Sequence, residues 1–203
     1  MKTDSFDDEN ITPELLEPIE YRNDVPICKD DENFRDTKSN DLKMSWQNTG
    51  NRINTFKWSR VVSAFDVAEY ILKKLGSLST MKLQKLVYYC QAWSLVWDEK
   101  PLFKENIEAW TNGPVIRELF SYHRGHYQIS KITLGNPDVL LDEQKETIDA
   151  VLDFYGDKSS QWLIELSHSE KPWQEARKNL KIDEISNKAI PLETMAEYYS
   201  SLQ

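Results

Sequence analysis

Apolar side chains recur at helical spacing from about residue 59 onward. Between Ser59 and Gly76 this spacing predicts an amphipathic helix, and Gly76 should end it because glycine commonly terminates helices. A second helix is expected to start from a cap at Ser79 or Thr80 and to run to Trp97.

This second helix is apolar around most of its circumference, which is typical of a buried helix. We therefore expect it to be the centre of the core, with Trp93 and Trp97 packed inside. The residues that support this are Leu83, Leu86, Val87, Tyr88, Tyr89, Cys90, Ala92, Trp93, Val96 and Trp97.

The middle of the chain carries strong turn signals. Asn112-Gly113-Pro114 predicts a turn, and Pro114 can begin a short helix that ends near Gly125. Residues 129–134 alternate like a short strand, which could pair with the run 107–110 as a minor sheet.

Further helices are predicted from Asp142 to Tyr155, over residues 159–166, from Pro172 and from Pro191. The predicted fold class is mainly α, a compact helical bundle around a buried central helix with a minor two-stranded β element.

Charge divides the chain into two parts. The net charge is −9; residues 1–50 hold 13 acidic and 6 basic residues, whereas residues 51–203 hold 21 and 19. A segment so acidic and poor in aliphatic residues does not fold alone. We predict an acidic extension over residues 1–58, either a flexible tail or an arm ordered on the domain or a partner, and a folded domain over 59–203. The apolar anchors of such an arm would be Trp46, Ile53, Phe56 and Trp58.

The acidic balance argues against a nucleic-acid ligand, because nucleic-acid-binding domains usually carry a basic excess. A partner with a basic surface is favoured instead. Met1 is followed by acidic residues rather than an apolar stretch, so no signal peptide is expected, and no run is apolar enough to span a membrane. Two cysteines, Cys28 and Cys90, give no disulfide framework, which favours the cytoplasm.

No pattern indicates an active site. His123 and His126 lack the further ligands that a metal site needs, and are interpreted as surface residues at a helix end. Cys90 could act as a nucleophile beside His168 only if the fold joined them; on an apolar face it is interpreted as an inert core thiol. There is no phosphate-binding glycine motif. We expect no enzyme activity, metal or cofactor.

Several blocks resemble the SocA-like (Panacea) antitoxin domain family, which is often phage-associated. The first is the helix over residues 81–93; the others are 101–103, 108–110, 113–115, His168, Pro172-Trp173 with Ala176-Arg177, and Ile190-Pro191. They lie in the family's order over about residues 60–202. The resemblance implies a compact helical domain that binds and neutralises a toxin protein in a toxin–antitoxin system, without catalysis. Some members instead deliver a toxin to a protease.

Residues that could contact a partner are Trp110, Asn112, Gly113, Lys82, Lys85, Trp173, Trp46, Phe56 and Trp58. Lys82 and Lys85 should form a solvated edge that could meet an acidic partner. Trp110 and Trp173, beside turn or helix-start signals, belong either to an interface or to the core.

Structural roles are expected for Gln84, Gln91, Trp93, Pro114, His168 and Pro172. Gln84 and Gln91 are seven residues apart and share a helix face, where they could brace the loop around Gly113 or shape a groove. Gly113-Pro114 should fix a turn that orients Trp110. His168 should satisfy backbone groups between helices, or else take an exposed binding role.

The leading hypothesis is an antitoxin-like protein that neutralises a cognate toxin by covering its surface. The alternatives are a proteolytic adaptor and a phage-encoded inhibitor of a host defence complex whose acidic arm mimics nucleic acid.

Overall fold

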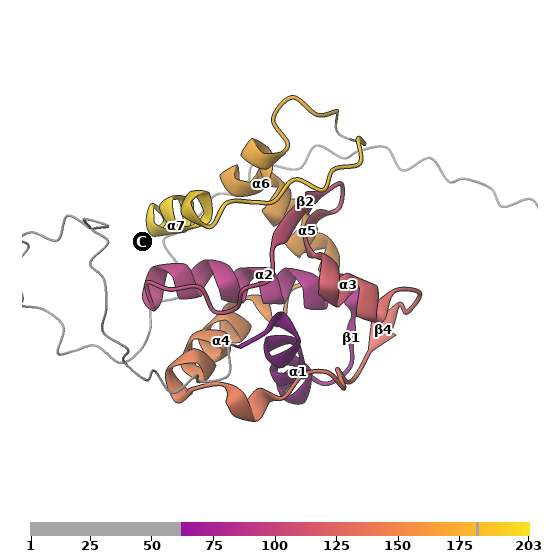
Figure 1. Cartoon of the computed structure of the whole chain (residues 1–203), viewed down its shortest axis with the longest axis vertical. Helices are drawn as coiled ribbons and strands as arrows, with labels where there is room; N and C mark the ends of the chain where they lie inside the picture. The colour runs from indigo at the N-terminus through magenta and orange to yellow at the C-terminus, as the bar shows by residue number, and fades with distance from the viewer. Residues whose placement is uncertain (1–61, 182) are drawn as a thin grey trace, which may run out of the picture.

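The computed structural model describes residues 62–181 and 183–203. The predicted extension, including Trp46, Ile53, Phe56 and Trp58, lies outside these residues. Within them the chain is mainly helical, as predicted (Figure 1). The elements are α1 (Ala64–Leu75), β1 (Leu78–Ser79), α2 (Thr80–Trp97), β2 (Ile107–Trp110), β3 (Gly113–Ile116), α3 (Arg117–His123), β4 (Gln128–Ile129), the 3-10 helix η1 (Pro137–Val139), α4 (Asp142–Tyr155), α5 (Ser160–Ser169), α6 (Lys171–Ala176) and α7 (Leu192–Ser200).

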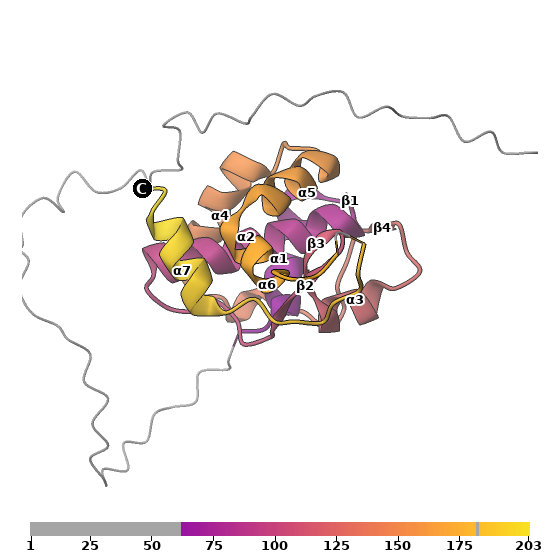
Figure 2. The same ribbon diagram turned by 90° about the horizontal axis from the view of Figure 1, so that it is seen from above.

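Helix α2 is the hub of the fold. Every residue from Leu83 to Ser94 on it is buried. Figure 1 shows α2 crossing the middle of the molecule, with α1 and α4 on one side and α6 and α7 on the other, and Figure 2 shows α7 lying over it from above. Because the helix is apolar around most of its circumference, it is stable only when covered on all sides. The prediction of a central buried helix is confirmed.

The helix ends follow local capping chemistry. Ser63 forms a capping box with Asp66 at the start of α1, and Gly76 ends that helix with a φ of 77°. The Ser79 hydroxyl accepts a hydrogen bond from the Lys82 amide, and Ser159 accepts one from Trp162. Each of these contacts satisfies a backbone group that a helix end leaves unpaired. The predicted ends at Gly76, Ser79 and Ser159 are confirmed.

The β structure differs from the prediction. Strands β2 and β3 form a tight antiparallel hairpin, with Ala109 opposite Pro114 and Trp110 opposite Gly113. Pro114 therefore begins no helix, and α3 starts only at Arg117. Proline is tolerated here because the Ala109 amide and carbonyl point away from β3, as expected at a non-hydrogen-bonded pair, so no amide is required of Pro114.

The run 129–134 does not pair with β2. Ile129 pairs with Leu78, so β4 and β1 form a separate small sheet. Ile132 is buried, whereas Leu134 is exposed. The outer edge of β2 is covered instead by the C-terminal segment, since the Ala109 amide donates to the Lys188 carbonyl at 2.9 Å and the Ile190 amide donates to the Ile107 carbonyl at 2.8 Å. The described residues contain no helix long and apolar enough to cross a membrane.

Candidate partner-binding site

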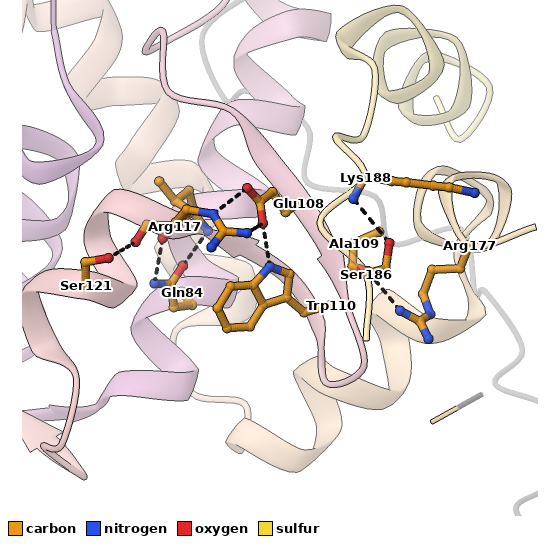
Figure 3. A network of polar contacts seen from close by, with 10 residues as sticks. Gln84, Glu108, Ala109, Trp110, Arg117, Ser121, Arg177, Ser186 and Lys188 are labelled. Atoms are coloured by element: carbon orange, nitrogen blue, oxygen red, sulfur yellow. Dashed lines mark hydrogen bonds and ion pairs between the residues drawn. The ribbon is translucent and has the colours of Figure 1, made fainter. Parts of the chain in front are cut away.

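Gln84 fastens the hairpin to the hub helix. Its side-chain oxygen accepts from the Ile116 amide at 2.9 Å, and its side-chain nitrogen donates to the Ile116 carbonyl at 3.2 Å (Figure 3). The same nitrogen lies 3.0 Å from Nε2 of His123. Because both amide hydrogens are then used, His123 must accept at Nε2, as a neutral ring does. Burial lowers the pKa of His123, which also favours the neutral ring.

Gln91 braces a different loop from the one expected. Its side-chain oxygen accepts from the amides of Leu102 and Phe103 at 2.9 and 3.1 Å, and its nitrogen donates to the Phe103 carbonyl at 3.1 Å. The two glutamines share a helix face, but a seven-residue step is about 10 Å along a helix, so they reach successive loops. Neither leaves an unsatisfied buried amide.

Lys85 is fully buried, so the expected solvated edge is wrong for this residue. Its Nζ donates to the Pro114 carbonyl at 2.9 Å, beneath the hairpin turn. Burial lowers the pKa of Lys85 to about 7. A lysine in this position cannot reach a partner. Lys82 is half-buried, and its Nζ donates to the Gly156 carbonyl at 2.7 Å.

Gly113 is required by this arrangement. Its φ is 93°, a conformation that other residues rarely adopt. A Cβ atom there would lie 2.8 Å from both Cε of Lys85 and Oγ of Ser167. Gly113 thus lets the turn close over the lysine, which is a structural role rather than the partner contact expected for it.

Trp110 is held rigidly on the outer face of the hairpin. Its indole nitrogen donates to Glu108 at 2.7 Å, and Arg117 donates to both oxygens of the same carboxylate at 2.7 and 2.6 Å (Figure 3). The Arg117 guanidinium lies 5.5 Å from the centre of the indole ring, and Phe120 packs edge-on against it at 4.8 Å. Burial raises the pKa of Glu108, but the hydrogen bonds from Arg117 and Trp110 outweigh it and lower the pKa overall.

A pocket of about 210 Å³ opens beside this half-buried tryptophan. Its walls come from the first turns of α2, the hairpin and the end of α3. The lining residues are Thr80, Met81, Gln84, Trp110, Thr111, Asn112, Val115, Phe120, His123, Arg124, Gly125 and His126. Of the residues expected to meet a partner, the structure brings Trp110 and Asn112 together here.

Trp173 lies behind the hairpin rather than on its outer face. It is 8% exposed, its indole nitrogen donates to the Trp110 carbonyl at 2.9 Å, and its ring stacks on His168 with centroids 4.1 Å apart. Trp173 therefore supports Trp110 from the core, and Pro172 beside it is buried at the start of α6. His168 also hydrogen bonds with the backbone of Thr111, while its Nε2 is buried without a partner among the described residues.

The core holds a second polar cluster. Glu170 is buried, and it accepts hydrogen bonds from the hydroxyls of Tyr199 at 2.7 Å and Tyr89 at 3.2 Å. Burial raises the pKa of Glu170 to about 8, despite the opposing effect of these hydrogen bonds. Trp93 is also in the core, where its indole nitrogen donates to the Tyr155 hydroxyl at 3.2 Å.

The interpretation of the two histidines needs correction. His123 is buried against Gln84, and only His126 is exposed. Cys90 is buried on α2, and burial raises the pKa of its thiol, which disfavours the reactive thiolate. The described residues hold no group of three or more His, Cys, Asp or Glu side chains placed to bind a metal.

Sequence reasoning missed the three residues that build the tryptophan mount, Glu108, Arg117 and Phe120. One signal was present for Glu108: it lies two residues before Trp110 in a strand, so both side chains emerge on the same face. Arg117 and Phe120 lie beside Trp110 only because the chain folds back as a hairpin. The sequence pattern predicted a helix from Pro114 instead, so it could not place them there.

One of the three comparisons with known proteins finds a similarity. Residues 83–174 match the model of the family described as Antitoxin SocA-like, Panacea domain. No curated protein matches the chain. No solved structure matches it either. The matched segment contains most of the hub helix, the hairpin, the tryptophan mount and most of the pocket, so this part of the chain is similar to the SocA-like (Panacea) antitoxin domain.

Proposed function

We propose that this protein is a cytoplasmic antitoxin-like inhibitor that binds a cognate toxin and covers its active or substrate-binding surface. The observation that carries the proposal is the family match, which spans the hub helix and the hairpin. In this proposal the protein performs no chemistry of its own and needs no cofactor.

The mount around Trp110 supports a protein partner. Energetically dominant positions in protein interfaces are enriched in tryptophan, tyrosine and arginine, and they lie in well-packed surroundings. Trp110 combines a fixed indole, held by Glu108 and Arg117, with a ring that remains half-exposed beside a pocket. Little side-chain freedom is then lost on binding, which lowers the entropic cost of association.

The charge distribution supports a partner with a basic surface. Residues 1–50 carry 13 acidic and 6 basic residues. Toxins that act on RNA need a basic substrate surface, and an acidic segment would compete for it and accelerate the encounter.

The test is co-expression with the product of the neighbouring open reading frame. We expect the neighbour to arrest growth alone, and this protein to restore growth and to co-purify with it. A Trp110→Ala variant should weaken the complex by about 2 kcal/mol or more, whereas Glu193→Gln, at an exposed site on α7, should leave it unchanged.

Three kinds of outcome would contradict inhibition of a toxin by occlusion. A neighbour that is harmless alone, or that stays toxic beside this protein, removes the antitoxin role. A toxin that is neutralised only because its half-life shortens would assign the protein as a proteolytic adaptor. Affinity for a host defence complex rather than for the neighbour would assign it as a phage-encoded inhibitor of defence.

A further inference from the structure

The pocket beside Trp110 is too small for an ordinary cofactor or substrate. Small-molecule sites usually enclose about 300–1,000 Å³. This pocket encloses about 210 Å³, and half of its boundary residues lie on the hairpin and the first turn of α2. Its size suits one large side chain inserted from a protein surface.

One side of the pocket is apolar. The rings of Trp110 and Phe120 meet edge to face at 4.8 Å, and Met81 and Val115 complete this side. His123 contributes a ring whose pKa is lowered by burial, so it adds no charge at neutral pH. An aromatic or large aliphatic side chain would therefore gain contact area here without meeting an opposing charge.

The charge at the rim of the pocket is opposite in sign to the net charge of the chain. The chain carries a net charge of −9, yet neither aspartate nor glutamate lines this pocket. Arg124 stands at its edge, exposed, and it forms no ion pair with any described residue. Asn112 and His126, both exposed, add hydrogen-bond donors on the same rim.

The rim is also anchored. The Thr80 amide donates to the Tyr127 carbonyl at 2.9 Å, and its hydroxyl donates to the His126 carbonyl at 3.2 Å. These bonds tie the turn that carries Arg124 to the start of the hub helix. The pocket and its cationic edge are thus formed before any partner arrives, which reduces the cost of binding.

From this geometry we propose that the pocket receives a large apolar side chain of the partner protein with the carboxylate of an adjacent aspartate or glutamate. The apolar group fills the space beside Trp110 and Phe120, and the carboxylate pairs with Arg124. This inference rests on the proposed function, because it takes the ligand to be a protein. The inference goes beyond that function in one respect. It states that the partner places an apolar side chain and a neighbouring carboxylate against the hairpin, independently of the charge it presents to residues 1–58.

The first experiment uses peptides in place of the unidentified partner. One capped tetrapeptide carries phenylalanine followed by glutamate, and its match carries glutamine instead of glutamate. Titrated into the full chain and followed by amide NMR shifts, the glutamate peptide should bind about threefold to fivefold more tightly. The largest shifts should fall on Trp110, Asn112 and Gly125.

The matched variants are Arg124→Gln and Lys178→Gln, the second at an exposed lysine just after α6 that does not line the pocket. Arg124→Gln should abolish the difference between the two peptides, and Lys178→Gln should preserve it. Equal binding of both peptides to the unaltered protein, shifts confined to another surface, or no shift at millimolar peptide would each overturn the inference.

The second experiment separates this inference from the proposed function. With the cognate toxin, Arg124→Glu should reduce affinity about tenfold or more, while Lys178→Glu should not. If the unaltered protein neutralises the toxin and Arg124→Glu does so equally well, the pocket assignment fails and the antitoxin role stands. If the unaltered protein fails to neutralise, the role fails, and the peptide titration alone decides the pocket.

Discussion

Burial moves the pKa values of two ionisable side chains in the core toward neutrality. Lys85 and Glu170 are both fully covered, and neither has an opposite charge as its partner. Desolvation disfavours the charged form of each, so the pKa of Lys85 falls to about 7 and that of Glu170 rises to about 8. Their contributions to stability therefore depend on pH in opposite directions.

Replacing Glu170 with glutamine should remove one of these dependences. The pKa of Glu170 rises from an ordinary value of 4.5 to about 8 in the folded protein, so the native state holds a proton that the unfolded state releases. Stability from this group is full below about pH 4.5 and is lost as the pH rises to about 8. The unfolding free energy of Glu170→Gln, relative to the unaltered protein, should increase by a few kcal/mol between pH 5 and pH 9.

Urea unfolding at pH 5, 7 and 9 provides the measurement. Glu193→Gln, at an exposed position, serves as the matched control and should parallel the unaltered protein. The opposite slope from Lys85, between about pH 7 and its ordinary 10.5, is common to all three proteins and cancels in the difference. A difference between Glu170→Gln and the unaltered protein that does not change with pH would contradict this account.

Residue type alone could not reveal that Lys85 and Glu170 are buried. Lysine is almost never fully buried, so a solvated position for Lys85 was the reasonable expectation. Its actual place depends on a glycine 28 residues later in the chain and on the Pro114 carbonyl, which only the closed hairpin supplies. The structural roles of Gln84 and Gln91 were easier to predict. A polar side chain on an apolar helix needs a buried hydrogen-bond partner, and a neighbouring loop can supply it.

At the scale of elements, local chemistry located the helices and failed at the hairpin. Helix ends depend on residues within one turn, such as Ser79 and Gly76, so sequence was sufficient. The hairpin required knowing that the Pro114 nitrogen faces away from β2. The direction of that nitrogen depends on the strand register. The register is set by which residues pair across the hairpin and cannot be read from composition.

Alanine substitutions at two glycines can test how tightly side chains pack beneath the hairpin. Gly76 and Gly113 both have positive φ, but a Cβ would meet nothing within 4 Å at Gly76, whereas at Gly113 it would meet Lys85 and Ser167 at 2.8 Å. Gly76→Ala should cost only the backbone strain, about 1–3 kcal/mol, because a φ of 77° with a ψ of −149° is adopted almost only by glycine. Gly113→Ala should add an overpacking cost of about 1–3 kcal/mol to the strain of its own positive φ.

Chemical denaturation of both variants measures the two costs. Combining Gly113→Ala with Lys85→Ala should give a smaller loss than the sum of the single losses, because the second change makes room for the added methyl group. A loss for the double variant equal to the sum of the two single losses would show that the contact with Lys85 is unimportant.

At the scale of the whole molecule, charge is distributed unevenly along the chain. Most of the net charge lies in residues 1–50, and the packed core lies in the described residues. An excess of acidic residues can change the rate of association with a basic partner.

Neutralising six acids in the full chain should slow association with the cognate toxin. The changes are Asp7→Asn, Asp8→Asn, Glu9→Gln, Asp30→Asn, Asp31→Asn and Glu32→Gln. At low ionic strength the association rate constant should fall by about tenfold, and its dependence on salt should flatten. Stopped-flow mixing at several salt concentrations measures both, with Glu146→Gln and Asp153→Asn on α4 as the control. An unchanged salt dependence would remove the role assigned to this segment.

Closure of the bundle by α7 has a consequence for how the protein is made. The Tyr199 hydroxyl meets that of Tyr88 at 3.1 Å, across 111 residues of chain, and both are fully buried. At about 5–20 residues per second, a ribosome needs roughly 5–20 s to pass from one tyrosine to the other. During that interval the aromatic side of α2 lacks its cover. Each newly synthesised molecule is therefore exposed to chaperones and proteases before its last helix emerges, and protection against a toxin would lag behind translation.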